Sequence, residues 1–235
     1  MRCTSIVRCP IPLCWAIAAG VAWFVASGGL ALFGAEGVGE PLGAAAESAP
    51  SGAALPAVVV AKEAVWLERF AAKEVRRYVY LRTGALMPIV EGLEAAPREA
   101  VVVTFGSTMR GEALGLDGHP QLPGDLFPAN QGDWCVLRTI EHGGRRVHVL
   151  AGGYPAGPLY AAYRLAERLG VRFSIEGDCV PDEPMPLALP RLDERRQALF
   201  DRRGIQPFHD FPEGPDWWDA DAYQAVITQL PKLGM

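Results

Sequence analysis

The residues best suited to chemistry lie in the last tenth of the sequence. Trp217 and Trp218 stand among three carboxylates, Asp216, Asp219 and Asp221. Aromatic rings stack on the apolar C–H faces of sugars, and carboxylates accept hydrogen bonds from sugar hydroxyls, so the pattern is typical of a sugar site. The same residues also suit a helix start, because Asp219 can cap a helix and Asp221 favours its first turn. Both interpretations of Trp217 stay open.

A second polar pair, His209 and Asp210, follows a predicted strand at residues 204–208. Side chains at the end of such a strand can contact a substrate. The alternative is a hydrogen bond between the two residues that only orders a loop. No further histidine or carboxylate cluster has the spacing of metal ligands, so we expect no metal.

A glycine-rich segment, residues 152–157 (GGYPAG), lies between a predicted strand and a predicted helix. A phosphate could bind there, with Glu176 and Asp178 after the next strand where a ribose would be held. The glycine spacing is not that of a dinucleotide-binding turn, and Pro155 removes an amide donor. A tight turn with proline in the first helical turn explains the segment more simply.

Hydrophobic periodicity predicts the elements that must position these groups. The predicted strands cover 56–60, 87–90, 100–105, 134–141, 146–151 and 171–175, and the predicted helices cover 67–83 and 158–169. Glycine follows each helix, and residues 106–130 look like a long surface loop. We therefore expect an α+β domain: a small mixed sheet with two helices on one face.

The chain divides into five predicted segments: 1–35, a signal peptide or N-terminal anchor; 36–55, a flexible linker; 56–180, the α/β domain; 181–198, a proline-rich linker; and 199–235, a second domain. That second domain is predicted to hold a strand at 201–207 and a helix at 220–232. One strand and one helix cannot bury their apolar sides alone, so we expect the second domain to be truncated.

Composition excludes some classes of partner. Half of the 235 residues are hydrophobic, the net charge is −5, and the basic residues occur as scattered pairs. A nucleic-acid partner is therefore not expected. Only two of the five cysteines, Cys135 and Cys179, lie outside the leader. They form either one disulfide or two separate buried thiols.

The leader resembles an export signal. Arg2 and Arg8 give a positive start, and residues 11–33 are uncharged and mostly apolar. Small residues allow cleavage after Ala31 or near Gly34. The run is also long enough to span a bilayer, so a membrane contact is expected if the leader stays. Either way we expect an exported protein, extracellular or periplasmic.

Two stretches carry a family resemblance. Residues 157–173 (GPLYAAYRLAERLGVRF) are similar to the last helix and strand of the N-terminal domain of alpha-glucuronidases, glycoside hydrolase family 67. The N-terminal domain of family 20 beta-hexosaminidases is related. Residues 202–218 (RRGIQPFHDFPEGPDWW) resemble the opening strand and loop of the (β/α)8 barrel that follows in such enzymes.

The resemblance implies a non-catalytic domain followed by the truncated start of a barrel. It implies a parent hydrolase of xylan-type polysaccharide that needs no cofactor, with its catalytic carboxyl groups on later strands, beyond residue 235. Arg203 matches a sugar-binding arginine, and His209 and Asp210 fall where the first loop meets the pocket. The loop departs from the alpha-glucuronidase pattern, which leaves the sugar open. The alternatives are a carbohydrate-binding scaffold and a nucleotide-binding domain.

The leader gives the first testable prediction. If it is cleaved, the secreted protein begins between Leu32 and Ala46, because the small residues that a signal peptidase accepts lie just before this interval. N-terminal sequencing of protein from the culture medium or periplasm checks this. A mature chain that retains Trp15 and sediments with membranes would establish the anchor instead.

Overall fold

The structure is a computed structural model that describes residues 7–9, 54–106, 114–123, 133–205 and 214–235. Its main sheet has six strands in the order β3-β2-β4-β6-β5-β9. Their bounds are β2 Ala57–Val60, β3 Ile89–Glu91, β4 Glu99–Phe105, β5 Trp134–His142, β6 Arg145–Gly152 and β9 Asp193–Gln197. The first four strands in this order run parallel, while β5 is antiparallel to both its neighbours. The predicted mixed sheet is confirmed.

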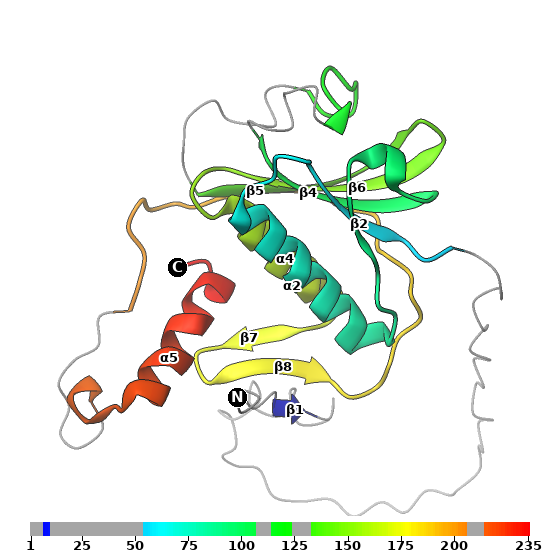
Figure 1. Ribbon diagram of the computed structural model, residues 1–235. Coiled ribbons are helices and arrows are strands. Elements are labelled where there is room, and N and C mark those ends of the chain that lie inside the picture. The colour runs from blue at the N-terminus through cyan, green and yellow to red at the C-terminus, as the bar shows by residue number, and fades with distance from the viewer. Residues whose placement is uncertain (1–6, 10–53, 107–113, 124–132, 206–213) are drawn as a thin grey trace, which may run out of the picture.

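Two helices, α2 (Trp66–Thr83) and α4 (Gly157–Arg168), lie side by side against one face of this sheet (Figure 1). This confirms the α+β arrangement expected from the sequence. Gly84 ends α2 in the left-handed conformation, with φ of 72°, which glycine adopts without strain. At the other end of α2 the buried carboxylate of Glu68 accepts hydrogen bonds from the amides of Val65 and Phe105, both at 2.9 Å. Glu68 therefore caps its own helix and ties it to the end of β4.

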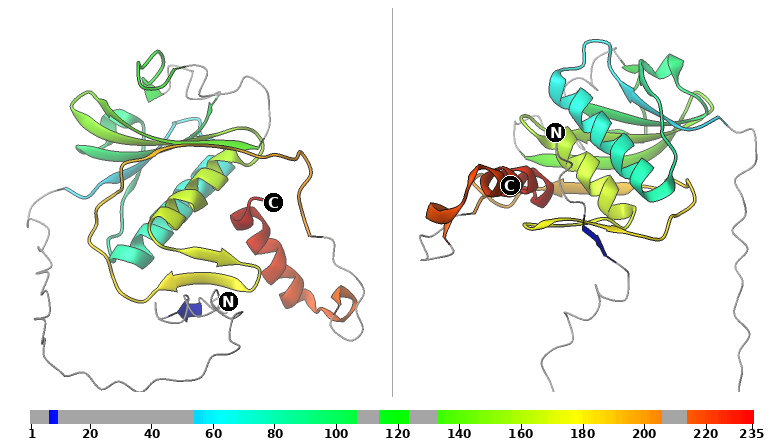
Figure 2. Two further views of the ribbon diagram at one scale, coloured as in Figure 1. Left: turned by 180° about the vertical axis from the view of Figure 1, so that it is seen from behind. Right: turned by 60° about the horizontal axis from the view of Figure 1, so that its bottom comes forward.

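A small second sheet lies on the far side of the helices. Strands β7 (Arg172–Ser174) and β8 (Gly177–Pro181) form a hairpin, and β1 (Val7–Cys9) pairs in parallel with β8. Figures 1 and 2 show α2 and α4 between the main sheet and this hairpin. The sequence does not predict β8, because its residues (GDCVP) have neither a β-branched run nor a clear alternation.

The centre of the main sheet is buried on both faces. All four residues of β2 and six of the seven in β4 are buried, as their β-branched sequences predict for parallel strands. The face away from the helices is covered in part by residues 114–123, where Leu114, Leu116 and Leu122 are buried (Figure 1). The prediction that residues 106–130 form a surface loop is therefore wrong at these three leucines, which are buried.

Strand β9 lies inside the range 181–198, for which the sequence predicts a linker. It pairs antiparallel with β5 from Trp134–Gln197 to Arg138–Asp193 and closes one edge of the sheet. Four of its five residues (DERRQ) are charged, so no hydrophobic pattern marks it; charged edge strands resist pairing with other chains. The sheet of the first domain thus extends beyond the predicted boundary at 180.

The remaining chain holds η2 (Leu93–Ala95), η5 (Pro215–Trp217), α5 (Ala220–Gln229) and η6 (Leu230–Leu233). The predicted final helix is confirmed, although its last turn tightens to a 3-10 helix. The strand predicted at 201–207 is wrong for residues 201–205, which form none, and residues 206–207 lie outside the described ranges. None of the helices in the described ranges is both long and apolar enough to cross a bilayer; residues 11–33 lie outside those ranges.

One buried histidine joins three strands of the main sheet. His148 on β6 is fully buried, and its ring nitrogens lie 3.0 Å from Thr139 Oγ1 on β5 and 3.0 Å from Glu99 Oε1 on β4. Burial lowers the pKa of His148, outweighing the hydrogen bond and the charge of Glu99, which both favour the protonated ring. The folded protein therefore binds a proton at this site less readily than the unfolded chain.

His148 should make stability depend on pH. Its pKa is lower in the folded than in the unfolded state, so its stabilisation is complete above about 6.5 and falls as the pH drops through the interval between the two values. We expect wild type to lose more unfolding free energy than His148→Gln between pH 7.5 and pH 5.5, by up to about 1.4 kcal/mol per pH unit. Urea denaturation at both pH values measures this. Equal losses in the two proteins would contradict it.

Candidate functional site

The candidate site lies where the C-terminal segment, residues 214–235, folds back onto the first domain. The amine of Lys232 on η6 contacts both carboxylate oxygens of Asp178 on β8, at 2.7 and 2.9 Å. Both side chains are buried, with exposures of 7% and 5%. Figure 2 shows α5 and η6 beside the β7–β8 hairpin and the helices. A buried ion pair therefore joins two parts of the chain that lie 54 residues apart.

Asp178 is also held by helix α2. The hydroxyl of Tyr78 donates to Asp178 Oδ2 at 2.7 Å, and the guanidinium of Arg77 lies 3.9 Å from the same oxygen. Burial raises the pKa of the Tyr78 hydroxyl far above its ordinary value, and the negative charge of Asp178 raises it further. The phenol therefore keeps its proton and remains a donor. A carboxylate whose two oxygens are both engaged in this way positions structure rather than transferring protons.

A second contact fastens the same segment from the sheet side. The guanidinium of Arg203 donates to Asp133 Oδ2 at 2.7 Å, to the carbonyl of Gly234 at 2.7 Å and to the carbonyl of Phe200 at 2.8 Å. All three of its nitrogens are thus used within the protein. Arg203, the predicted sugar-binding arginine, links Asp133, just before β5, and Phe200, after β9, to Gly234 of the C-terminal segment.

Of the other predicted sugar-binding residues, only Trp217 falls in the described ranges, and it is not among the residues that surround Arg203. Trp217 ends η5, is 60% exposed and does not line the hollow of 350 Å³ beside Arg203. Asp219 accepts a hydrogen bond from the amide of Ala222 at 2.9 Å, so the helix-cap interpretation of this residue is confirmed. His209 and Asp210 lie outside the described residues.

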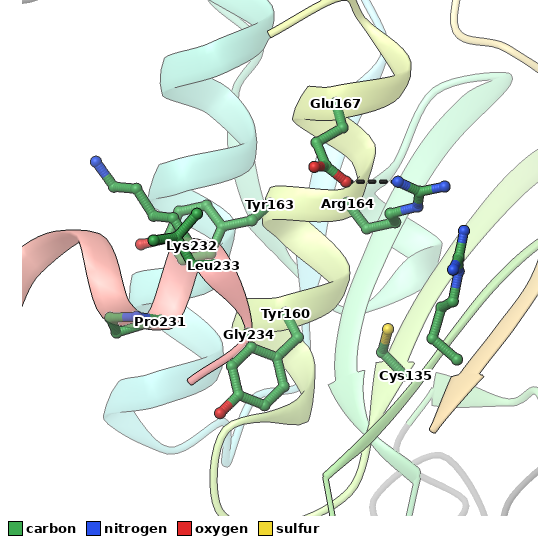
Figure 3. Close-up of a pocket in the computed structure, with 10 residues that line it drawn as sticks. Cys135, Tyr160, Tyr163, Arg164, Glu167, Pro231, Lys232, Leu233 and Gly234 are labelled. Carbon is green, nitrogen blue, oxygen red and sulfur yellow. Dashed lines mark hydrogen bonds and ion pairs between the residues drawn. The ribbon is translucent and has the colours of Figure 1, made fainter. Parts of the chain in front are cut away.

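Behind η6 is a small pocket of 290 Å³ (Figure 3). It is lined from α4 by Tyr160, Arg164 and Glu167 and from β5 by Cys135. Burial raises the pKa of the Cys135 thiol to about 12, so the thiol stays protonated and is a poor nucleophile or metal ligand. No disulfide joins Cys135 and Cys179, so the prediction of two separate thiols is confirmed, although only Cys135 is buried and Cys179 is half-buried.

Two residues that line this pocket, Arg164 and Glu167, belong to an ion-pair network centred on Glu194 of strand β9. Arg164 and Arg168 of helix α4 both donate to the Glu194 carboxylate, and Arg164 also pairs with Glu167 (Figure 3 draws this last pair). Burial disfavours the charged carboxylate, but the hydrogen bonds from the two arginines outweigh it and lower the pKa of Glu194. The network holds the charged edge strand against helix α4.

The glycine-rich segment is used for packing between β6 and α4. A Cβ atom added to Gly152 would lie 2.0 Å from the carbonyl carbon of Gly157, so the backbones touch at this point. The amides of Gly153 and Gly157 donate to the carbonyls of Trp134 and Gly153. Pro158 occupies the first turn of α4. The tight-turn interpretation accounts for these residues, and Asp178, the predicted ribose ligand, is engaged by Lys232.

Within the described ranges no cluster of three or more histidine, cysteine or acidic side chains could hold a metal ion. A comparison with protein-family models gives no match, and a comparison with curated proteins gives no significant match. The site is therefore defined by its own geometry: a buried lysine–aspartate pair, an arginine with three internal partners, and the hollows between them. The sequence offers one signal for it, since Asp178 is an acidic residue shortly after a predicted strand, but its partner Lys232 is too distant to be inferred from spacing.

The contacts of Arg203 predict a structural effect of its removal. Arg203→Ala deletes three hydrogen bonds, two of them to backbone carbonyls and one to a carboxylate, and should loosen residues 214–235 while the main sheet stays folded. Limited trypsin digestion should then cut after Lys232 and near residue 203 at least about fivefold faster than in wild type. Arg202→Ala is the matched control. Unchanged cleavage in Arg203→Ala would show that the contact does not hold the segment.

Proposed function

We propose that this chain is the N-terminal accessory domain, with the start of a (β/α)8 barrel, of an exported glycoside hydrolase that resembles alpha-glucuronidases and acts on xylan-type polysaccharide. The observation that carries the proposal is the Asp178–Lys232 pair. Through this pair the first domain binds the segment that follows it; we call the binding surface, made by Asp178 and Tyr78, the seat. A domain of this kind would fix the position of a catalytic barrel relative to the polymer.

The resemblance and the seat coincide in the fold. Residues 157–173, which carry the first likeness, form α4 and most of β7. These elements provide Tyr163 and Phe173, whose rings pack edge-on against Tyr78, the residue that donates to Asp178. The stretch that resembles the hydrolase domain is thus the stretch that supports the seat.

Two buried carboxylates of the first domain, Glu68 and Asp178, support a non-catalytic role. Glu68 accepts hydrogen bonds from two amides and from Thr104 Oγ1, and Asp178 is bound by Lys232 and Tyr78. Glycoside hydrolysis needs one carboxyl group to protonate the leaving oxygen and a second across the sugar ring. Neither of these two residues is free for such work. In the parent enzyme, by this proposal, both groups come from later barrel strands.

The structure disfavours one of the two alternative functions, the nucleotide-binding domain, and is compatible with the other, the carbohydrate-binding scaffold. A nucleotide-binding domain would need amides directed at a phosphate, whereas those of Gly153 and Gly157 are bonded internally. A non-catalytic carbohydrate-binding scaffold shares every feature of the seat and differs only in having no hydrolytic barrel. Activity of the complete gene product separates the scaffold from the enzyme.

We expect the 235-residue chain to show no turnover of xylan, glucuronoxylan or aryl glycosides, and the product of the complete reading frame of its gene to release sugar from at least one of them. The reason is the requirement for two carboxyl groups at a fixed separation. Reducing-sugar and uronic-acid assays on both proteins test this. Turnover by the 235-residue chain would contradict the accessory role, and none by the complete product would favour the scaffold.

A further inference from the structure

A groove of about 550 Å³, larger than the two hollows beside Arg203 and Cys135, lies between α2, α4 and α5. Phe70 of α2 and Leu159 and Tyr163 of α4 line it on one side, and Ile227 and Thr228 of α5 line it on the other. Its size falls in the range of small-molecule sites, which is roughly 300–1,000 Å³. Asp178 and Lys232 are among the residues that line it, so the pair that joins the C-terminal segment to the first domain also forms part of the groove.

One end of the groove is aromatic and open to solvent. Phe70 is 38% exposed, and Trp66, one helical turn earlier, is 74% exposed. Their ring centroids lie 6.1 Å apart, with an angle of 45° between the planes. Phe70 lines the groove and Trp66 lies beside Phe70, outside the lining residues, so the two rings give a surface next to the groove on which apolar C–H faces can stack. This surface has no role in the seat.

The other end is polar, and its charges are nearly balanced. Arg77 reaches two buried carboxylates, with Nη1 3.4 Å from Glu74 Oε1 and Nη2 3.9 Å from Asp178 Oδ2. Its side chain remains 37% exposed, so some of its five N–H donors face solvent. The groove also includes Glu176, so three carboxylates face two cations. An anionic ligand would be repelled, whereas hydroxyl groups can both accept from Arg77 and donate to the carboxylates.

We propose that this groove binds a neutral oligosaccharide, with a sugar ring stacked on Phe70 and Trp66 and its hydroxyls bonded to Arg77 and the neighbouring carboxylates. The proposal rests on the proposed function, since it names the ligand class that the accessory domain takes. It gives the domain a second task besides seating the barrel: holding a neutral stretch of the polysaccharide.

Calorimetric titration of the 235-residue chain with xylohexaose, cellohexaose and chitohexaose tests the proposal, with hexagalacturonic acid as the anionic probe. We expect at least one neutral probe to bind and the acidic probe to bind more weakly. Phe70→Ala should weaken the neutral probe by about fivefold or more. Phe70→Trp, which keeps an aromatic face and guards against a folding defect, should stay within about twofold of wild type. Tyr80→Ala is the matched control, an exposed aromatic of the same helix outside the groove.

Three outcomes would overturn the groove site: no binding of any neutral probe at about 5 mM, equal affinity of Phe70→Ala and wild type, or tighter binding of the acidic probe. Hydrolysis by the complete gene product keeps this failure separate from that of the proposed function. If the complete gene product hydrolyses glycosides but the 235-residue chain binds no neutral probe, the groove proposal is wrong and the proposed function stands. If the 235-residue chain binds a neutral probe but the complete gene product is inactive, the proposed hydrolase function is wrong and the groove proposal stands.

Discussion

The arrangement of this chain depends on one buried carboxylate. The carboxylate of Asp178 on β8 accepts hydrogen bonds from Lys232 of the C-terminal segment and from Tyr78 of helix α2. Strand β8, helix α2 and the C-terminal segment therefore meet at one side chain. Removing a carboxylate and an amine from water costs several kcal/mol per ion, a cost that only close and complete partnering offsets. The pair is therefore stable only in the docked geometry. Once the segment lifts, Asp178 is a buried charge with one principal donor, Tyr78, and Lys232 is better solvated elsewhere. This constraint favours a single position of α5 over many loose ones.

The other features follow from that position. With α5 seated, Ile227 and Thr228 form the second wall of the groove whose first wall is Phe70 and Tyr163. With η6 seated, Gly234 comes within reach of Arg203, and the hollow behind Cys135 is covered. The first domain supplies a rigid base for this, because β2 and β4 are buried throughout the centre of the sheet and Glu68 ties α2 to β4. The docking of the C-terminal segment thus also forms the groove, which links the proposed role in positioning a barrel to the proposed binding of saccharide.

Much of the fold is predictable because its strands and helices carry strong hydrophobic periods. The run AVVV of β2, the spacing along α2 and the two glycines between β5 and β6 each indicate one local structure. Strands β8 and β9 escape prediction because β8 is short and irregular, while β9 (DERRQ) is held by backbone pairing with β5 and by ion pairs rather than by burial. The candidate site is harder still. Asp178 stands out as an acidic residue after a strand, but its partner Lys232 is distant in sequence. Arg203 is predicted to bind sugar from the family resemblance, and the sequence gives no sign of its hydrogen bonds to Asp133 and Gly234.

The central claim is that Asp178 and Lys232 act as one unit, and a double-mutant cycle measures this directly. Asp178→Asn, Lys232→Met and the double variant are compared with wild type by the free energy of unfolding in urea. Each single change leaves a buried group without its charged partner and should cost about 3–5 kcal/mol, whereas the double change should cost clearly less than the sum, with a coupling energy of at least about 1 kcal/mol. Single losses that add to the double loss within about 0.5 kcal/mol would show that the two residues act independently. In that case other contacts would hold the C-terminal segment, and the Asp178–Lys232 pair would not be what seats it.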